Sequence, residues 1–284
     1  MTKGFQLTEE TAWCPGCGNF AIRQAVAQAL GRCELEPNRV VLVSGIGQAA
    51  KLPHYINTNI FNGLHGRAVP AATAIKAVNH DLTVLVTTGD GDCYGEGGNH
   101  LLHAFRRNPD ITILVHDNQV YGLTKGQASP TSEYGFVTKL QSHGVKNEPL
   151  NPVALAVAMD ASLVARGFAG DIQGLAALIA LAVKHRGLSL VDIRQPCVSF
   201  NKLNTYAWYR ERVYYPEEGT HDPSDRVAAF RLALTWGDRI PLGVIYRRER
   251  PVFEEQFAAL TEGTLVSRPY PGTALLEKAL AAFY

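Results

Sequence analysis

The sequence shows almost no excess of charge of either sign. Its 284 residues include 27 Lys and Arg against 26 Asp and Glu, a formal net charge of +1. A nearly neutral chain lacks the electrostatic attraction that binds nucleic acid or an anionic membrane surface, so neither is an expected partner. Charged residues make up only 19% of the chain and hydrophobic residues 46%. This balance predicts a globular protein with part of its surface covered by another subunit.

The sequence also lacks long apolar runs. No stretch approaches the roughly 20 apolar residues that span a bilayer. Residues 1–14 have neither the apolar core of a secretory signal nor the basic amphipathic character of a transit peptide. We therefore expect a cytoplasmic protein without a membrane segment.

Short β-branched segments alternate with helical patterns over the first 200 residues. The segments are apolar throughout, which is typical of parallel strands whose sheet is covered by helices on both faces. The predicted strands are residues 40–45, 83–89, 111–118, 162–168 and 189–196. The predicted helices are residues 21–30, 71–79, 98–108 and 172–187.

The composition changes near residue 200. Residues 201–284 are at first polar, aromatic and rich in turn formers, and they contain one clear strand pattern, LGVIYR. One strand is too little for an independent core. We therefore predict an α/β domain over residues 1–200, with a mostly parallel sheet flanked by helices, and a C-terminal extension over 201–284 packed on it.

A glycine-rich turn with a carboxylate follows the predicted strand 83–89. Gly89, Asp90 and Gly91 come where that strand ends, before the predicted helix 98–108. Glycines let the backbone approach phosphate oxygens, N–H groups at a helix start attract the anion, and a carboxylate holds a hard cation beside it. Open α/β sheets bind ligands at such strand ends. The motif therefore indicates a site for a diphosphate and a divalent cation.

The next predicted strand, 111–118, ends in Asn118. If the two strands are neighbours, Asn118 reaches the same sheet edge as Asp90, and the backbone carbonyl of Val120 adds a third protein oxygen for Mg²⁺. The 25 residues 92–116 separate GDG from the Asp-Asn dipeptide. A lone GDG is typical of an ordinary turn, but the pair at this interval resembles the signature of thiamine diphosphate binding.

The cysteines give a second candidate site. The sequence has five of them, an odd number, and Cys14 and Cys17 are spaced CxxC just before a helical pattern. Zinc, a redox disulfide and an iron–sulfur cluster all use this spacing, and CxxC alone does not choose among them.

Several blocks together resemble the β subunit of 2-oxoacid:ferredoxin oxidoreductases. The blocks run from residue 13 to about 246. They are WCPGCGNF, GIGQAAKLPHY, LHGRA, GDGDCYGEGGNH, HAFRRN, DNQVYGLTKGQASPT, QPCVSFN and WGDRIPLGVIY. The resemblance implies a thiamine-diphosphate-binding fold with Mg²⁺ and one [4Fe–4S] cluster.

The resemblance also implies an activity and partners. It implies CoA-dependent oxidative decarboxylation of a 2-oxoacid, 2-oxoglutarate before pyruvate, with electrons passing through the cluster to ferredoxin. A larger α subunit is expected to carry the pyrimidine-binding domain, in an αβ or (αβ)₂ assembly, so the chain alone should be inactive. The alternatives are a non-oxidative thiamine-diphosphate lyase or synthase with a structural CxxC, and a scaffold subunit stabilised by metal.

The resemblance maps three cluster ligands onto Cys14, Cys17 and Cys197. The fourth does not map, because Gln48 stands where the plainest members have cysteine, and Gln is not an ordinary ligand for a thiolate cluster. Either the fourth ligand is not a cysteine, or another cysteine replaces it. We predict Cys93, which directly follows GDGD, in preference to Cys33 at a predicted helix end.

The remaining expected site residues surround the cofactor. Lys51 and Lys125 suit a substrate carboxylate, Lys125 also suits CoA, and His65 suits a diphosphate oxygen. The residues expected to contact the cofactor are Ile46, Gly47, His65, Gly89, Asp90, Gly91, Asp92, Asn118, Val120, Tyr121, Gly122, Leu123 and Thr124.

Overall fold

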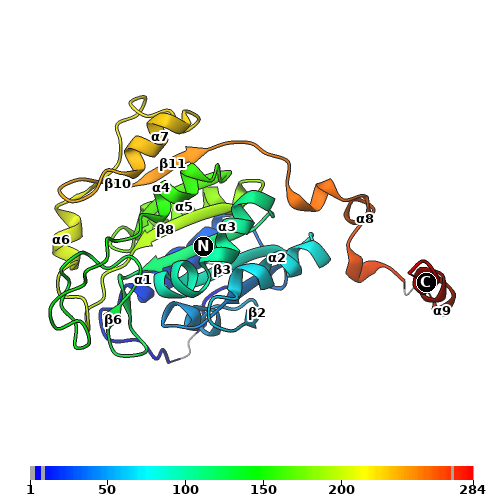
Figure 1. Ribbon diagram of the computed structural model, residues 1–284, viewed down its shortest axis with the longest axis horizontal. Coiled ribbons are helices and arrows are strands. Elements are labelled where there is room, and N and C mark those ends of the chain that lie inside the picture. The colour runs from blue at the N-terminus through cyan, green and yellow to red at the C-terminus, as the bar shows by residue number, and fades with distance from the viewer. Residues whose placement is uncertain (1–3, 8–9, 270–271, 284) are drawn as a thin grey trace.

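A seven-stranded sheet forms the centre of the computed structural model, which describes residues 4–7, 10–269 and 272–283 (Figure 1). The strand order is β11-β7-β8-β4-β3-β1-β2. All neighbours run parallel except β11, which pairs antiparallel with β7. The strands are β1 (Val40–Ser44), β2 (Asn59–Asn62), β3 (Thr83–Gly89), β4 (Thr112–Asp117), β7 (Leu163–Phe168), β8 (Ser189–Arg194) and β11 (Gly243–Arg247). The predicted α/β fold with a mostly parallel sheet is confirmed.

Helices cover both faces of this sheet. The helices in the described part of the chain are α1 (Gly18–Arg32), α2 (Ala68–Val78), α3 (Gly98–Arg107), α4 (Pro152–Ala158), α5 (Ile172–Lys184), α6 (Tyr206–Arg210), α7 (Arg226–Ala233), α8 (Ala258–Thr261) and α9 (Thr273–Ala281). Short strands β5 (Val120–Tyr121), β6 (Gln127–Ala128), β9 (Val213–Tyr214) and β10 (Ile240–Pro241) lie outside the sheet. Short helical turns are η1 (Pro37–Arg39), η2 (Ala49–Tyr55), η4 (Phe253–Gln256), η5 (Leu265–Ser267) and a π-helical turn, η3 (Gly91–Glu96).

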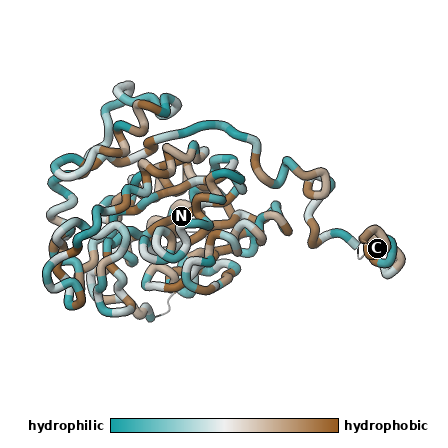
Figure 2. Tube along the Cα trace, viewed as in Figure 1, coloured by the Kyte–Doolittle hydropathy of each residue, from teal (hydrophilic) through white to brown (hydrophobic). Residues whose placement is uncertain are grey.

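Alternate residues along the strands pack into two separate hydrophobic cores, one on each face of the sheet. Val41 and Val43 of β1 pack with α2, α3, α4 and α7, a side that we call the α2–α3 face. Leu42 packs with α1 and α5 on the other side, the α1–α5 face. Each fully buried aliphatic side chain contributes about 1.5–3 kcal/mol relative to an exposed one. Figure 2 shows the hydrophobic residues gathered along the central strands.

Strand β2 and helix α4 are among the elements of this domain that were not predicted. The four residues of β2 are all exposed, so they present no apolar run to recognise. Helix α4 has seven residues, about two turns, which is too short for helical periodicity to stand out. Its start is nevertheless marked, because the Asn151 side chain accepts a hydrogen bond from Ala154 N and Pro152 occupies the first turn.

The chain beyond residue 200 has two different parts. Strand β11 joins the main sheet at its edge, and Arg250 donates to the carbonyls of Phe105 and Asp160. Helix α9 has no buried residue and lies away from the sheet (Figure 1). The boundary at residue 200 stays a prediction, although part of the segment after it completes the sheet. Within the described residues, no helix is both long and apolar enough to cross a membrane.

Candidate functional site

The carboxyl ends of β3, β4 and β8 lie side by side. Gly89 at the end of β3 is opposite His116, and Asp117 at the end of β4 is opposite Arg194. Asp90 and Asn118, one residue beyond these positions, therefore leave the sheet at neighbouring points. The predicted adjacency of the two strands is confirmed.

A shared threonine hydroxyl joins two buried carboxyl groups at this edge. Thr131 Oγ1 lies 2.8 Å from Asp90 Oδ2 and 2.8 Å from Asp117 Oδ1. One hydroxyl has a single proton, so it donates to only one of these oxygens, and the other contact needs a protonated carboxyl or a cation. Burial raises the pKa of Asp90, and it raises the pKa of Asp117 well above its usual range. Arg194 supplies a positive charge to Asp117, but among the described residues Asp90 forms no ion pair.

Asn118 begins a tight turn that leads into β5. Its Oδ1 accepts a hydrogen bond from Val120 N at 3.0 Å, and Gln119 between them has a left-handed φ of 60°. The carbonyl of Asn118 accepts from Asn201 Nδ2 at 3.3 Å. An amide oxygen has two lone pairs, so Asn118 Oδ1 keeps one for a cation.

Asp92 ties three loops together. Its Oδ1 accepts from Gly66 N at 2.7 Å and from Ile46 N at 3.2 Å, and it lies 2.7 Å from His65 Nδ1. Its Oδ2 accepts from Thr88 Oγ1 at 2.6 Å. The protein therefore occupies both oxygens of this buried carboxylate. The side chain positions His65 and the loop at Ile46, and the cofactor contact of Asp92 stays a prediction.

The ring of Tyr121 covers the glycines after β3. A Cβ on Gly91 would lie 2.2 Å from the ring, and one on Gly95 would lie 2.5 Å from the hydroxyl oxygen. Tyr121 Oη donates to Gly91 O at 3.3 Å, and the centroid of the His65 ring is 6.2 Å from that of Tyr121. Burial raises the Tyr121 pKa to about 12, so this hydroxyl keeps its proton near neutral pH.

The outer side of this site is open. Ile46 is 40% exposed and Leu123 is 41% exposed. Thr124 and Lys125 are also exposed, while Lys51 and Gly122 are half-buried and Val120 is buried. Lys125 has a left-handed φ of 81°. Two exposed aliphatic side chains beside two lysines form a surface that a bound anion or another subunit would cover.

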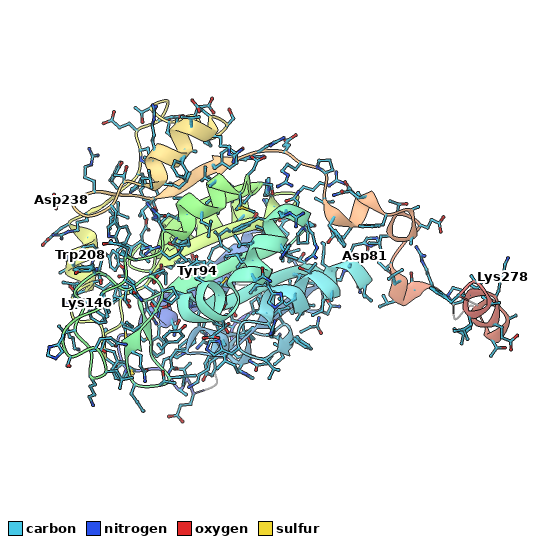
Figure 3. The ribbon with its side chains drawn as sticks, viewed as in Figure 1. Asp81, Tyr94, Lys146, Trp208, Asp238 and Lys278 are labelled. Atoms are coloured by element: carbon cyan, nitrogen blue, oxygen red, sulfur yellow. The ribbon has the colours of Figure 1, made fainter. Side chains whose placement is uncertain are left out.

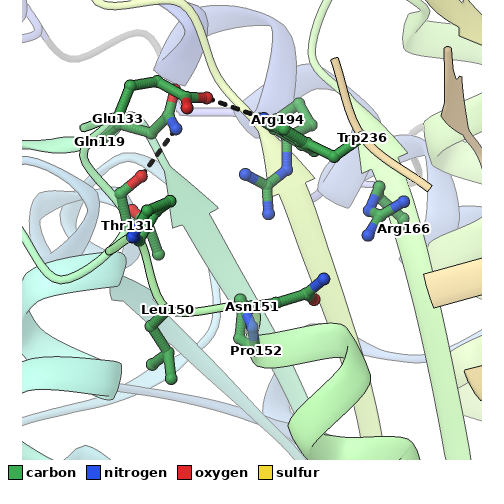
Figure 4. A pocket seen from close by; sticks show the side chains of 10 residues that line it. Gln119, Thr131, Glu133, Leu150, Asn151, Pro152, Arg166, Arg194 and Trp236 are labelled. Carbon is green, nitrogen blue, oxygen red and sulfur yellow. Dashed lines mark hydrogen bonds between the residues drawn. The ribbon is translucent and has the colours of Figure 1, made fainter. Parts of the chain in front are cut away.

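A small cavity of about 150 Å³ lies on the inner side of the carboxyl network. Thr131, Arg166, Arg194 and Trp236 are among its lining residues, and Figure 4 shows the two guanidinium groups directed toward it. Arg194 Nη2 lies 2.8 Å from Asp117 Oδ2 and also pairs with Asp192. Burial, with the nearby charge of Arg194, lowers the Arg166 pKa to about 10, so Arg166 remains cationic near neutral pH.

Two loops bring the predicted ligands Cys14, Cys17 and Cys197 together. Gln195 Nε2 lies 3.5 Å from Cys17 Sγ, and a Cβ on Gly16 would lie 3.7 Å from Val198 Cγ1. Cys14 is exposed, and Cys17 and Cys197 are half-buried. Burial raises the pKa of Cys17, and the nearby thiols of Cys197 and Cys14 raise it further. The CxxC loop therefore packs against the loop that carries Cys197.

Comparison with known proteins decides the family. Residues 41–193 match the family described as thiamine pyrophosphate enzyme, C-terminal TPP binding domain. Residues 197–262 match the family described as the C terminal of the pyruvate ferredoxin oxidoreductase beta subunit. The 2-oxoacid:ferredoxin oxidoreductase subunit beta of Sulfolobus sp is 44% identical over 282 residues, covering 94% of this chain and 91% of that protein. The chain belongs to the β subunits of 2-oxoacid:ferredoxin oxidoreductases.

Two further members of the family have names that mention 2-oxoglutarate. The 2-oxoglutarate oxidoreductase subunit KorB of Mycobacterium tuberculosis is 45% identical over 199 residues, 70% of this chain and 53% of that protein. A solved 2-oxoglutarate:ferredoxin oxidoreductase from Magnetococcus marinus, with 2-oxoglutarate, coenzyme A and succinyl-CoA bound, superposes with a TM-score of 0.91. Its identity is 34%, and the match covers 98% of this chain and 95% of that one. The resemblance drawn from the sequence, and the oxidoreductase class, are confirmed.

The packing of Cys93 opposes its predicted role as the fourth cluster ligand. Cys93 is 2% exposed and packs within the α2–α3 face, among residues such as Val43 and Val86. Cys17 packs against the α1–α5 face. The sheet thus separates the two thiols. The π-helical turn η3 accounts for this placement, because it directs Cys93 into the core and its neighbour Tyr94 toward Asp192, where Tyr94 Oη donates to Oδ1 at 2.8 Å.

Gln48 lies between the cysteine loops and the loop after β4. Trp13 Nε1, next to Cys14, donates to Gln48 O at 2.9 Å. A Cβ on Gly122 would lie 3.6 Å from Gln48 Cγ. Gln48 Oε1 is buried without a hydrogen-bond partner in the described part of the chain. In the same part, no three His, Cys, Asp or Glu side chains lie close enough to hold a single metal ion.

The sequence analysis did not identify Thr131 and Arg194, which contact the buried carboxyl groups of Asp90 and Asp117. Thr131 is 41 residues from Asp90, and Arg194 follows a later strand. The QASPT block contains Thr131, but nothing in its pattern relates it to the earlier carboxylate. Arg194 lies near the end of the predicted strand 189–196, directly before QPC, and that position was the one available signal.

Proposed function

We propose that this β subunit binds thiamine diphosphate and Mg²⁺ at the ends of β3 and β4, and that it serves CoA-dependent oxidative decarboxylation of a 2-oxoacid. The observation that carries the proposal is the buried Asp90 carboxyl beside Asn118, at the carboxyl edge of the sheet. Both residues lie in the segment that matches the thiamine pyrophosphate binding domain.

The carboxyl network supports a divalent cation. Asp90 and Asp117 compete for one threonine proton, and a cation at Asp90 would remove the need for a second proton. Asp90, the free lone pair of Asn118 Oδ1 and the carbonyl of Val120 would hold Mg²⁺, for which oxygen ligands are the preferred type. Gly91 has no side chain, and the ring of Tyr121 occupies the space that one would fill.

The open side of the site supports binding of the substrate. Thiamine diphosphate, when bound, supplies the electron sink that decarboxylation of a 2-oxoacid requires. This chain's own residues orient and neutralise: Asp92 fixes His65 for a diphosphate oxygen, and Lys51 and Lys125 offer positive charge to a carboxylate or to CoA. Ile46 and Leu123 would exclude water once a ligand and the larger partner protein lie over them.

The cysteine loops support electron transfer through an iron–sulfur cluster. Cys14, Cys17 and Cys197 would hold it, because iron–sulfur clusters are bound by thiolates. A cluster is wider than a single ion, so its ligands stand farther apart than those of a mononuclear metal site. We assign ferredoxin as the acceptor, in accord with the names of the relatives.

The proposed substrate is 2-oxoglutarate, with pyruvate next. The support for 2-oxoglutarate is the name of the relative from Mycobacterium tuberculosis and that of the superposed structure. The support for pyruvate is the description of the family matched by residues 197–262. A larger α subunit would contribute the pyrimidine-binding domain, in an αβ or (αβ)₂ complex.

The test is an assay of the chain co-expressed with its α subunit. We expect reduction of ferredoxin or a viologen that depends on a 2-oxoacid, on CoA and on thiamine diphosphate, with 2-oxoglutarate giving the highest rate. The β subunit alone should be inactive. Full oxidation by the isolated chain, or a complex that purifies without thiamine diphosphate, would refute the proposal, and a complex without visible iron–sulfur absorption would favour a non-oxidative lyase.

A further inference from the structure

The five cysteines of this chain fall into two groups. Cys14, Cys17 and Cys197 lie on loops that contact each other at the carboxyl edge of the sheet. Cys93 is in the core on the far side of that sheet. Cys33 follows the last residue of α1, while Cys17 precedes its first, so the 15 residues of the helix, about 22 Å, separate them. Only three thiolates are therefore available to one cluster.

Gln48 contacts the loop of Cys14 and Cys17 and has an amide in place of a thiol. Its backbone oxygen is held by Trp13, the neighbour of Cys14, and its Cγ approaches Gly122 in the loop after β4. Its Oε1 is buried and, among the described residues, has no hydrogen-bond partner. An unpartnered buried amide oxygen costs about 1–3 kcal/mol, which a ligand or donor at that position would offset.

We propose that this chain binds its cluster through three thiolates only, with the fourth iron at the Gln48 corner, between the cysteine loops and the Tyr121–Lys125 loop. The inference rests on the iron–sulfur cluster of the proposed function. An amide oxygen is neutral and hard, and it holds iron much more weakly than a thiolate does. The fourth iron is therefore exchangeable, on the side of the cluster that faces the cofactor loop.

The expected chemistry is the loss of that iron on oxidation. One electron passes from the [4Fe–4S]²⁺ core to a one-electron oxidant such as ferricyanide, one Fe²⁺ leaves the Gln48 corner, and [3Fe–4S]⁺ remains on the three cysteines. Fe²⁺ and a reductant reverse the change. The three Fe–sulfide bonds of the departing iron and its contact with the Gln48 amide break, the four sulfides stay with the remaining three irons, and no Fe–thiolate bond breaks.

The experiment uses the αβ complex purified without oxygen, as wild type, Gln48→Cys, Cys93→Ala and Cys33→Ala. The complex is treated with ferricyanide, and iron release and the electron paramagnetic resonance signal of a three-iron cluster are measured. We expect wild type to release iron and give that signal, and Fe²⁺ with dithionite to restore the original cluster. Gln48→Cys should lose iron more slowly by about tenfold or more, the scale on which even outer-shell groups change metal affinity.

Cys33→Ala and Cys93→Ala are the matched controls. Both should have wild-type iron and sulfide contents and wild-type iron release. The inference is overturned if wild type resists oxidation as well as Gln48→Cys does, or if Cys93→Ala or Cys33→Ala loses the cluster while the complex stays folded. A folded complex in which no variant contains sulfide would instead refute the cluster of the proposed function, and this inference with it.

Discussion

Asp90 is 1% exposed and Cys14 is on the surface, although both lie at the carboxyl edge of one sheet. The diphosphate side of this edge is attached to central strands, and its carboxyl groups are held by Thr131 and Arg194. The cysteine side is made from loops, and its thiols have few protein partners. We infer that the fold itself maintains the first site, whereas the second depends on the group that it binds.

The strongest test of this difference is Asp90→Asn in the αβ complex. Loss of the carboxylate should weaken Mg²⁺-dependent binding of thiamine diphosphate by about 100-fold or more, and activity with it. The substitution should not lower the stability of the cofactor-free chain. Burial raises the Asp90 pKa, so its ionised form destabilises the native state, and that penalty grows as pH rises from the unfolded pKa toward the folded one. Bound cofactor and the melting temperature of the cofactor-free chain near pH 7 are the measurements.

A lower melting temperature in Asp90→Asn would contradict this comparison, because it would mean that the carboxylate stabilises the empty fold. The matched control is Asp238→Asn, since Asp238 is an exposed carboxylate at a bend of the chain (Figure 3). That variant should bind the cofactor as wild type does.

Asp92→Ala should damage the fold where Asp90→Asn does not. Removing this carboxylate leaves the Thr88 hydroxyl and the N–H groups of Gly66 and Ile46 without their acceptor. Unsatisfied buried donors cost about 1–3 kcal/mol each, so we expect a loss of about 3 kcal/mol in unfolding free energy after partial relaxation. Urea denaturation of the cofactor-free chain, beside Asp238→Ala, measures it. A loss equal to that of the control would show that these loops are held by other contacts.

The buried His116 makes the stability of the strand that carries the diphosphate site depend on pH. It is fully buried in β4, with Nδ1 2.7 Å from Asn19 Oδ1, and burial lowers its pKa from 6.5 to about 3. Below pH 6.5, His116 is protonated in the unfolded chain but stays neutral in the native chain. The stability that His116 contributes is therefore present above pH 6.5 and is lost as the pH falls. The loss between pH 7 and 5 is about 2 kcal/mol.

His116→Gln removes the titrating group and keeps an amide donor toward Asn19. Unfolding free energies of both proteins at pH 7 and pH 5 isolate the effect, since the other acidic groups are common to both. An equal drop in wild type and variant would rule out His116 as its source.

The sequence predicts the diphosphate site, which follows β3 and β4, much better than it predicts the cysteine site, which is made from loops. Asp90 and Asn118 end apolar strands, and parallel strands place their carboxyl ends together, so the neighbourhood follows from periodicity alone. Cys93 shows the limit of this reasoning. It is three residues from Asp90 in sequence, but the π-helical turn sends its side chain through to the other face. Thr131 joins Asp90 through an irregular loop, and no pattern encodes such a contact.

The smallest expected effect belongs to Cys93→Ala, which tests whether the sheet separates the two sites. A buried thiol replaced by a methyl group leaves a small cavity, and we expect a loss of about 1 kcal/mol in unfolding free energy. Iron content and visible absorption of the complex should stay at wild-type values, because the side chain lies on the α2–α3 face.

Cys197→Ala should give the opposite pattern. It should abolish the cluster and leave the stability of the cofactor-free chain nearly unchanged. The reason is that this half-buried thiol accepts a hydrogen bond only from Phe200 N, at 3.4 Å, among the described residues. Iron loss in Cys93→Ala, or a large loss of stability in Cys197→Ala, would mean that the two sites share a structural support that their separate faces do not reveal.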